Sequence, residues 1–278
     1  MKCLALSFTL LAASFLSGCG AYLTTITPSA PAGLGGNWQI SVYELTAPPP
    51  NARFAISGAL AVQGSQVTGT FRALPTVNTP CVSDRQDLAF TGALDSANML
   101  TLTSAPFSGS VATLRFPVPP TNNVSTGTAT IVGGLCATSA TTVTALFTPP
   151  VTGTYTGTLT PPLLLSGQSG PPNTPGPATL TLLQADADAD GRFPVTGTMT
   201  FASTSCTLSP TPVYGIISGL NLTLSPYTTP PNSLGNFSVH VTPAPTSYTS
   251  AKVNFSMFGL ANPTACPYGV YLGDLTRQ

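Results

Sequence analysis

An aspartate run in the second half of the chain is the residue pattern with the clearest chemical potential. Asp186, Asp188 and Asp190 alternate with alanine and are followed by Gly191. Alternating carboxylates before a glycine form the first half of a twelve-residue calcium loop, in which oxygen ligands converge on one cation. The complete loop needs a glutamate at its twelfth position, where this sequence has Gly197. Two interpretations remain: weak calcium binding, or a hairpin turn in which Asp190-Gly191 supplies the positive backbone torsions.

Three further residues carry chemistry just after a cysteine in the first half. Asp84 and Asp87 flank Arg85, and paired carboxylates are the acid and base of glycoside cleavage. The arginine between them more simply predicts a surface ion pair. His240 is the single histidine, and no GxSxG nucleophile motif accompanies it. The sequence therefore predicts a protein that is not an enzyme, with a metal-assisted hydrolase as the alternative.

The scarcity of charge excludes whole classes of partner. Only 16 of 278 residues are Lys, Arg, Asp or Glu, and the net charge is zero. Charged residues make up 6% of the chain, against about 25% in an ordinary soluble domain. Nucleic-acid binding depends on clustered Lys and Arg, so we expect no nucleic-acid partner. A neutral glycan, a peptide or a small apolar molecule suits such a surface better.

Composition and alternation predict an all-β protein. The chain has 44 Thr, 26 Gly and 29 Pro, and β-branched threonine suits strands whereas glycine and proline oppose long helices. Residues 53–63 place Phe54, Ile56 and Leu60 on one parity, which indicates one buried and one solvated face. Sixteen such runs are expected, near 36–45, 53–63, 66–73, 88–95, 98–104, 109–118, 124–133, 141–148, 151–160, 177–185, 192–202, 212–218, 220–226, 234–243, 250–260 and 268–275.

The cysteines and repeated landmarks predict two tandem homologous domains, at 36–149 and 150–278. Cys81 and Cys136 lie 55 residues apart, and Cys206 and Cys266 lie 60 apart. The tetrapeptide Val-Thr-Gly-Thr precedes the first cysteine of each pair. Duplication therefore predicts one disulfide within each half, whereas a tetrahedral metal site would need closer cysteine pairs or more histidine.

Eight short strands per half fit an up-and-down barrel or a two-sheet sandwich, and both halves could also merge into one larger sheet system. In an antiparallel meander, the connection after the third strand and the connection before the eighth emerge at the same end. Each predicted disulfide joins those two connections, so its geometry is consistent with the meander. Aromatic residues such as Trp38, Tyr43, Phe54, Phe71 and Phe90 would then either fill the interior or line a cavity for an apolar ligand.

The first residues predict export. Lys2 precedes an apolar stretch too short to span a bilayer, and the stretch ends in Leu16-Ser17-Gly18-Cys19. This quartet resembles the lipobox of bacterial lipoproteins. The resemblance implies cleavage of a signal peptide at residues 1–18 and acylation of Cys19, with palmitate-type chains inserted in the membrane. Gly20 after the cysteine would favour the outer membrane, and residues 19–35 are expected to form a flexible tether. The alternative is an ordinary secretory signal with an incidental cysteine.

Two further resemblances concern the mature chain. The opening Gly36-Asn37-Trp38-Gln39-Ile40 resembles the start of small lipocalin-like and avidin-like barrels. As a whole the chain resembles uncharacterised threonine-rich bacterial lipoproteins, and that resemblance implies an envelope location. The predicted function is a lipid-anchored, non-catalytic binding module. A structural component of the envelope is the alternative from a different class.

Overall fold

The computed structural model describes residues 34–44, 52–76, 81–134, 136–160, 174–203, 207–219, 221–226, 237–242, 252–258 and 270–278. All the regular secondary structure within these ranges consists of β-strands, as the composition predicts. In the same ranges the structure holds no helix of the length and apolarity that crossing a membrane requires. The predicted signal peptide and Cys19 lie outside the described residues.

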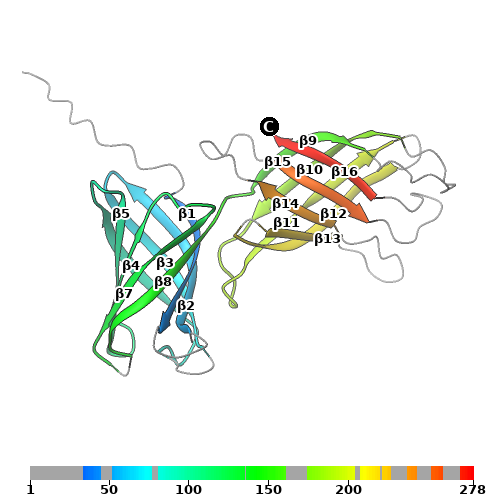
Figure 1. Cartoon of the computed structure of the whole chain (residues 1–278). Coiled ribbons are helices and arrows are strands. Elements are labelled where there is room, and N and C mark those ends of the chain that lie inside the picture. Colours follow the sequence, from blue (N-terminus) through cyan, green and yellow to red (C-terminus); the bar gives the residue numbers. More distant parts are fainter. Residues whose placement is uncertain are drawn as a thin grey trace, which may run out of the picture.

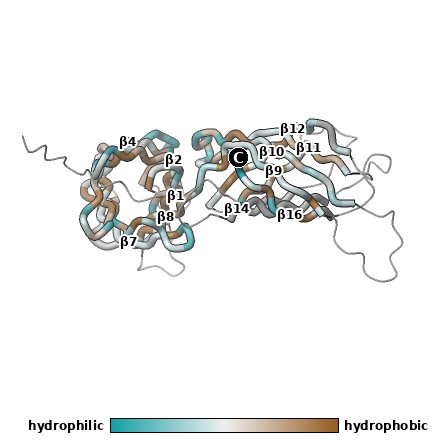
Figure 2. The backbone as a smooth tube through the Cα atoms, turned by 90° about the horizontal axis from the view of Figure 1, so that it is seen from above, coloured by the Kyte–Doolittle hydropathy of each residue, from teal (hydrophilic) through white to brown (hydrophobic). Residues whose placement is uncertain are grey.

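The first half is a closed antiparallel barrel of eight strands (Figure 1). Its strands pair in chain order, and β1 closes the barrel by pairing with β8 as well as β2. Figure 2 shows this barrel nearly end-on, as a ring. The strands are β1 (Gly36–Glu44), β2 (Ala52–Gln63), β3 (Gln66–Leu74), β4 (Gln86–Leu94), β5 (Met99–Ser104), β6 (Val111–Pro117), β7 (Val124–Val132) and β8 (Thr138–Thr148).

The second half is a second closed barrel with the same meander order. Here β9 pairs with β10 on one side and with β16 on the other. The structure thus decides for two barrels over a sandwich or one merged sheet. The strands are β9 (Gly153–Leu159), β10 (Gly176–Gln184), β11 (Phe193–Ala202), β12 (Thr207–Ser218), β13 (Asn221–Pro226), β14 (Phe237–Thr242), β15 (Lys252–Phe258) and β16 (Val270–Arg277).

The two barrels open in the same way despite a change of residue. The indole Nε1 of Trp38 donates a hydrogen bond to the carbonyl of Leu34 at 3.0 Å. Tyr155, which takes the place of tryptophan in β9, donates its hydroxyl to the carbonyl of Val151 at 2.8 Å. Both acceptors lie four residues before their donors, and all four residues are fully buried. Leu34, at the end of the predicted tether, is therefore part of the first barrel.

Alternation along the strands divides each barrel into an apolar interior and a hydroxyl-rich exterior. Phe54, Ile56 and Leu60 point inward in β2, as their parity predicts. On the outside, threonines pair across neighbouring strands, for example Thr126 with Thr144. Such pairs suit an antiparallel surface without adding charge. The threonine content is therefore explained by the wet faces of two barrels.

Glycines at the centre of inward-facing rows let strands curve tightly enough to close a small barrel. A Cβ on Gly127 would lie 1.9 Å from the carbonyl oxygen of Arg115 on the neighbouring strand. A Cβ on Gly197 in the second barrel would lie 1.9 Å from the carbonyl oxygen of Thr181. No side chain fits at these distances, so the backbones approach each other only because the residues are glycine.

The first predicted disulfide is present. Cys81 and Cys136 are bonded, with their Cα atoms 5.3 Å apart. They join the β3–β4 and β7–β8 connections, which emerge at the same end of the barrel as the meander requires. Cys206 and Cys266 lie outside the described residues, so their pairing stays a prediction.

Candidate functional site between the barrels

The interior of the first barrel is filled by the aromatic residues that could have lined a cavity. The ring of Trp38 lies 5.7 Å from that of Phe116 and 5.1 Å from that of Phe147, measured between centroids. Phe71 and Phe90 stack edge to face at 5.4 Å. These side chains are at most 3% exposed. Tyr43 differs, because it lies on the outer face and lines a groove there.

A groove of about 680 Å³ lies on the outside of the first barrel. Its floor is the outer face of β2, β3 and β4, and its opposite side is formed by Asp186 and Ala187 of the second barrel. The floor presents methyl and hydroxyl groups, from Ala59, Ala61, Thr68, Thr70, Ala89 and Thr91. The groove is therefore open, lined mainly by small uncharged side chains, and nearly neutral. It differs from the closed aromatic pocket considered from sequence.

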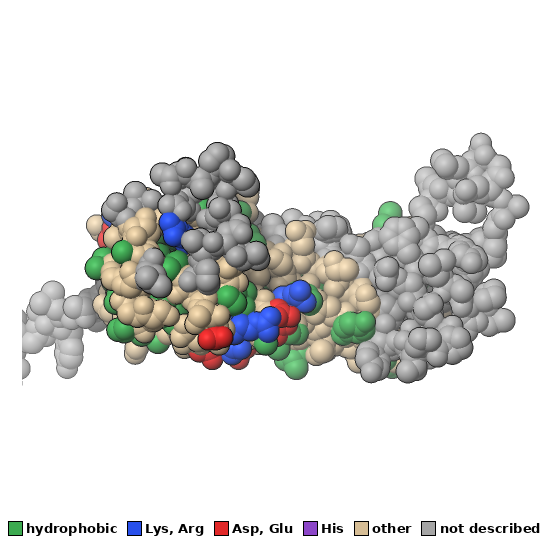
Figure 3. Space-filling view, turned by 90° about the horizontal axis from the view of Figure 1, so that it is seen from below, with side chains coloured by type: hydrophobic (Ala, Val, Ile, Leu, Met, Phe, Trp, Pro, Cys, Tyr) green, Lys and Arg blue, Asp and Glu red, His purple; other side chains and the backbone are tan. Residues whose placement is uncertain are grey.

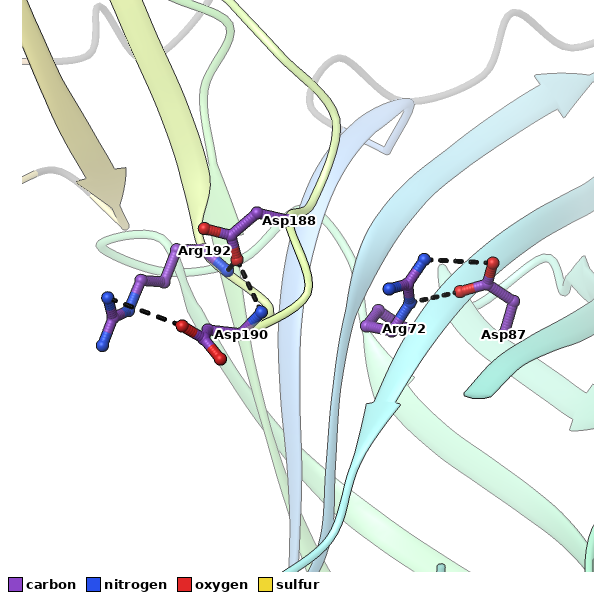
Figure 4. A network of polar contacts seen from close by, with 5 residues as sticks. All are labelled: Arg72, Asp87, Asp188, Asp190 and Arg192. Carbon is purple, nitrogen blue, oxygen red and sulfur yellow. Dashed lines mark hydrogen bonds and ion pairs between the residues drawn. The ribbon is translucent and has the colours of Figure 1, made fainter. Parts of the chain in front are cut away.

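An ion pair borders this groove. Arg72 on β3 and Asp87 on β4 face each other across the ladder. The Arg72 Nε lies 2.5 Å from one carboxylate oxygen of Asp87, and the Nη2 lies 3.2 Å from the other. This hydrogen bond and the charge of Asp87 raise the pKa of Arg72 above its usual value. Figure 4 shows the fork-shaped contact, which holds both side chains in one orientation.

The aspartate run forms the turn between β10 and β11. Asp188 accepts hydrogen bonds on one carboxylate oxygen from the backbone N–H of Asp190 at 2.8 Å and of Arg192 at 2.9 Å (Figure 4). Its carbonyl accepts from the N–H of Gly191 at 3.0 Å. Gly191 has a φ of 69°, so a positive torsion is found at the glycine as predicted, whereas Asp190 does not have one. The Asp188 side chain thus organises its own turn.

Asp95 builds the same turn in the first barrel without any neighbouring carboxylate. It accepts from the N–H of Ala97 and of Met99, both at 2.9 Å, and its carbonyl accepts from the N–H of Asn98 at 3.0 Å. Asn98 occupies the position of Gly191 and has a φ of 59°. Because the pattern recurs where no ion could be coordinated by an aspartate run, the contacts of Asp188 are those of a turn.

No group of three or more His, Cys, Asp or Glu side chains assembles into a metal-binding arrangement among the described residues. Asp190 instead pairs with Arg85 at 2.6 Å and lies 3.8 Å from Arg192. Asp186 contributes to the groove wall. The geometry therefore favours the turn over the calcium loop, and calcium binding stays a prediction to be tested with a chelator.

The charged cluster after Cys81 is dispersed. Asp87 pairs with Arg72, whereas Asp84 accepts a hydrogen bond from the Ser83 hydroxyl at 3.1 Å. Arg85 does form the surface ion pair that the sequence suggests, but with Asp190 of the second barrel. The two carboxylates of the hydrolase alternative thus have different partners. His240 lies in β14, paired with Asn221 and Asn254 in the ladder, and its side chain lies outside the described residues.

The sequence did not indicate the residues that join the barrels. Gln39 on β1 donates its side-chain amide to the carbonyl of Gly191 at 3.3 Å and accepts from the Ser218 hydroxyl at 2.7 Å. Gln39 and Tyr43 also line a second groove of about 350 Å³ on the other side of the Asp188–Arg192 turn. The two hydrogen bonds connect residues that lie 152 and 179 positions apart in the sequence. No local pattern could therefore have revealed them.

No protein-family model matches this chain, and no curated protein matches it. Two solved structures align with most of it. The Myxococcus xanthus hemagglutinin in complex with a3,a6-mannopentaose is 12% identical, with a TM-score of 0.22 over 87% of this chain and 99% of that chain. Kievitone hydratase from Nectria haematococca is 11% identical, with a TM-score of 0.24 over 91% of this chain and 92% of that chain.

Proposed function

We propose that this chain is a lipid-anchored, non-catalytic binding protein of a bacterial envelope, and that it binds a neutral glycan or peptide in the groove between its barrels. The observation that carries the proposal is the groove itself: an open volume of about 680 Å³ floored by small hydroxyl and methyl groups. Pockets of a few hundred Å³ or more are the usual size of ligand sites. Because side chains fill the interior of the first barrel, we place the ligand on its outer face.

The chemistry of the groove favours an uncharged ligand with many hydrogen-bonding groups. Threonine hydroxyls both donate and accept hydrogen bonds, and the alanines between them let a flat ligand approach the strands. Arg72 and Asp87 neutralise each other at the border, so they offer polar contacts without a net attraction for ions. An apolar molecule would find few large apolar side chains on this floor.

The second candidate function is a structural component of the envelope. The observation that favours it is the same filled core, because a protein that only spaces or coats needs no cavity. The two functions differ in whether the groove is occupied. A screen of neutral oligosaccharides and peptides against the full chain, with Cys19→Ser to keep it in solution, separates them.

Thr70 and Thr128 provide a matched pair of variants for that screen. Both are exposed outward-facing threonines of the first barrel, but only Thr70 lines the groove. We expect Thr70→Tyr to weaken binding of any ligand found at least about tenfold, or ~1.4 kcal/mol, because the ring occupies the floor. Thr128→Tyr should leave affinity unchanged. Equal affinities would place the ligand elsewhere, and a screen without any binder would support the structural role.

Membrane attachment is tested separately in a bacterial host that processes lipoproteins. Acyl chains on Cys19 would hold the protein at a bilayer without any apolar protein surface. The native chain should sediment with membranes, and Cys19→Ser should be released into the soluble fraction. Continued sedimentation of Cys19→Ser would contradict the lipid anchor.

A further inference from the structure

Charge in this protein is concentrated at the junction of the two barrels. Six of the chain's 16 charged residues form the ion pairs or line the groove there, and a seventh, Asp188, organises the β10–β11 turn that carries three of them. Figure 3 shows basic and acidic side chains gathered on that face, with hydrophobic and other uncharged surface beside them. The seven are Arg72, Arg85, Asp87, Asp186, Asp188, Asp190 and Arg192. Nearly half of the chain's few charged residues thus lie where the barrels meet.

The Asp188–Arg192 turn makes the contacts. Asp190 pairs with Arg85 of the first barrel at 2.6 Å. The carbonyl of Gly191 accepts from the Gln39 side chain at 3.3 Å. A second turn supports the first, because the N–H of Gly219 donates to the hydroxyl of Thr148 at 3.0 Å. These bonds reach β1, the β3–β4 connection and the end of β8, so the second barrel contacts the first at three separate places.

The contact between the two barrels is close-packed at Gly191. A Cβ built on this glycine would lie 2.7 Å from Leu74 Cδ1 and 2.9 Å from Ser57 Oγ. Ser57 is on the outward parity of β2, yet only 4% of it is exposed, because the turn covers it. Glycine suits the positive φ at position 191, and the neighbouring barrel leaves no room there for a Cβ.

The connection between the barrels is short and keeps them adjacent, whereas the contacts of the turns set their relative orientation. Thr148 is the last residue of β8, and Val151 is already fully buried in the second core. Only Pro149 and Pro150 lie between them, and a two-residue linker reaches only about 6 Å, so the barrels stay adjacent. The N–H of Val151 also donates to the Gln184 side chain at 2.9 Å. This bond lies within the second barrel and fixes Val151 there, so the second barrel begins directly after the two prolines.

We propose that the outer face of the first barrel around Ser57, Leu74 and Arg85 is a docking surface for the second barrel, and that the Asp188–Arg192 turn is the element that recognises it. The two barrels then form one rigid unit, and the groove exists only in that unit because Asp186 and Ala187 supply its far side. This explains why the aspartate run has no counterpart in the corresponding Gln63–Gln66 turn of the first barrel. The inference goes beyond the proposed function and does not depend on the identity of a ligand.

Gly191→Asn tests the docking in the full chain. Asparagine tolerates positive φ. Asn98 already occupies the equivalent position in the Asp95–Met99 turn of the first barrel, which has the same hydrogen bonds. The variant should therefore keep the turn but press its side chain against Ser57 and Leu74. Gly64→Asn is the matched control, because Gly64 has a φ of 64° in the β2–β3 turn of the first barrel.

The measurement is the rotational correlation time of each barrel from backbone ¹⁵N relaxation, with small-angle scattering for the overall dimensions. We expect one common correlation time for the native chain and for Gly64→Asn. Gly191→Asn should show two shorter correlation times, one per barrel, with a larger radius of gyration. Independent tumbling in the native chain, or a common time in Gly191→Asn, would overturn the proposal.

A second set of variants covers the case in which Gly191→Asn does not fold. Arg85→Gln and Gln39→Ala remove first-barrel partners of the turn and leave the turn sequence intact. We expect the double variant to lose the common correlation time, and Arg115→Gln, which removes an intra-barrel pair with Asp95, to keep it. A common time in the double variant would overturn the proposal. If a variant keeps the common correlation time but no longer binds the ligand, that result would instead count against the proposed function.

Discussion

Replacement of Cys81 and Cys136 by alanine is expected to lower the free energy of unfolding of the first barrel by about 4 kcal/mol. The bond joins residues 55 positions apart. The chain-entropy relation gives a loop of that length about 14 cal/mol/K, which is about 4 kcal/mol at 25 °C. Alanine is chosen because the cysteines are 3% and 4% exposed, and serine would bury unpaired hydroxyls.

Fluorescence makes this measurement specific to one barrel. Trp38 is the single tryptophan of the chain and is fully buried in the first core. Urea unfolding followed by Trp38 emission therefore reports the first barrel, and reduction of the native bridge should reproduce the shift of the double variant. Cys206→Ala with Cys266→Ala is the matched control and should leave the Trp38 transition in place.

Two results would refute the reasoning. One is a loss of less than about 1 kcal/mol in the Trp38 transition, well below the usual range for a native disulfide. The other is peptide mapping under non-reducing conditions that links Cys81 to Cys206. The first would remove the energetic role of the bridge, and the second would remove the pairing of cysteines within each half.

Three further predictions concern Trp38, Asp95 and the aspartate run. Trp38→Phe should destabilise the first barrel in urea by about 1–3 kcal/mol beyond the loss of volume, because the carbonyl of Leu34 loses its buried donor; Trp38→Tyr, which copies Tyr155 of the second barrel, should recover part of that loss, and equal stability of the two variants would contradict the equivalence. Hydrogen bonds from the N–H groups of Met99 and Ala97 lower the pKa of Asp95, so its stabilising contribution is present above the unfolded pKa of about 4 and is lost as the pH falls through the lower folded value. Asp95→Asn should weaken this acid dependence of the midpoint in urea, and an unchanged pH profile would argue against it. If Asp186, Asp188 and Asp190 form a turn and no calcium site, thermal melting should be the same with calcium and with chelator, whereas a higher midpoint with calcium would support the ion.

The sequence by itself determined the strands and where they change direction. Alternation in a threonine-rich chain makes one face apolar, so the parity of Phe54, Ile56 and Leu60 was enough to assign them to the core. Glycine and short polar connections then marked the turns, and the ends of most described strands lie within two or three residues of those predicted. The similar spacing of the two cysteine pairs assigned the Cys81–Cys136 bond correctly, because a meander brings alternate connections to one end. Local patterns suffice for these features because each depends on neighbours in sequence or on the order of strands.

Only the tertiary structure decided how the barrels close, what fills them and how they meet. Closure depends on pairing of the first strand with the last, and the filled core depends on side-chain volumes that meet across the barrel. The aspartate run shows the limit most clearly. Asp188 organises its own turn, as its sequence neighbours allow, but Asp190 faces Arg85 and Gly191 packs on Ser57. Contacts between surfaces so far apart in the chain follow from shape and distance in three dimensions, which residue type and spacing do not encode.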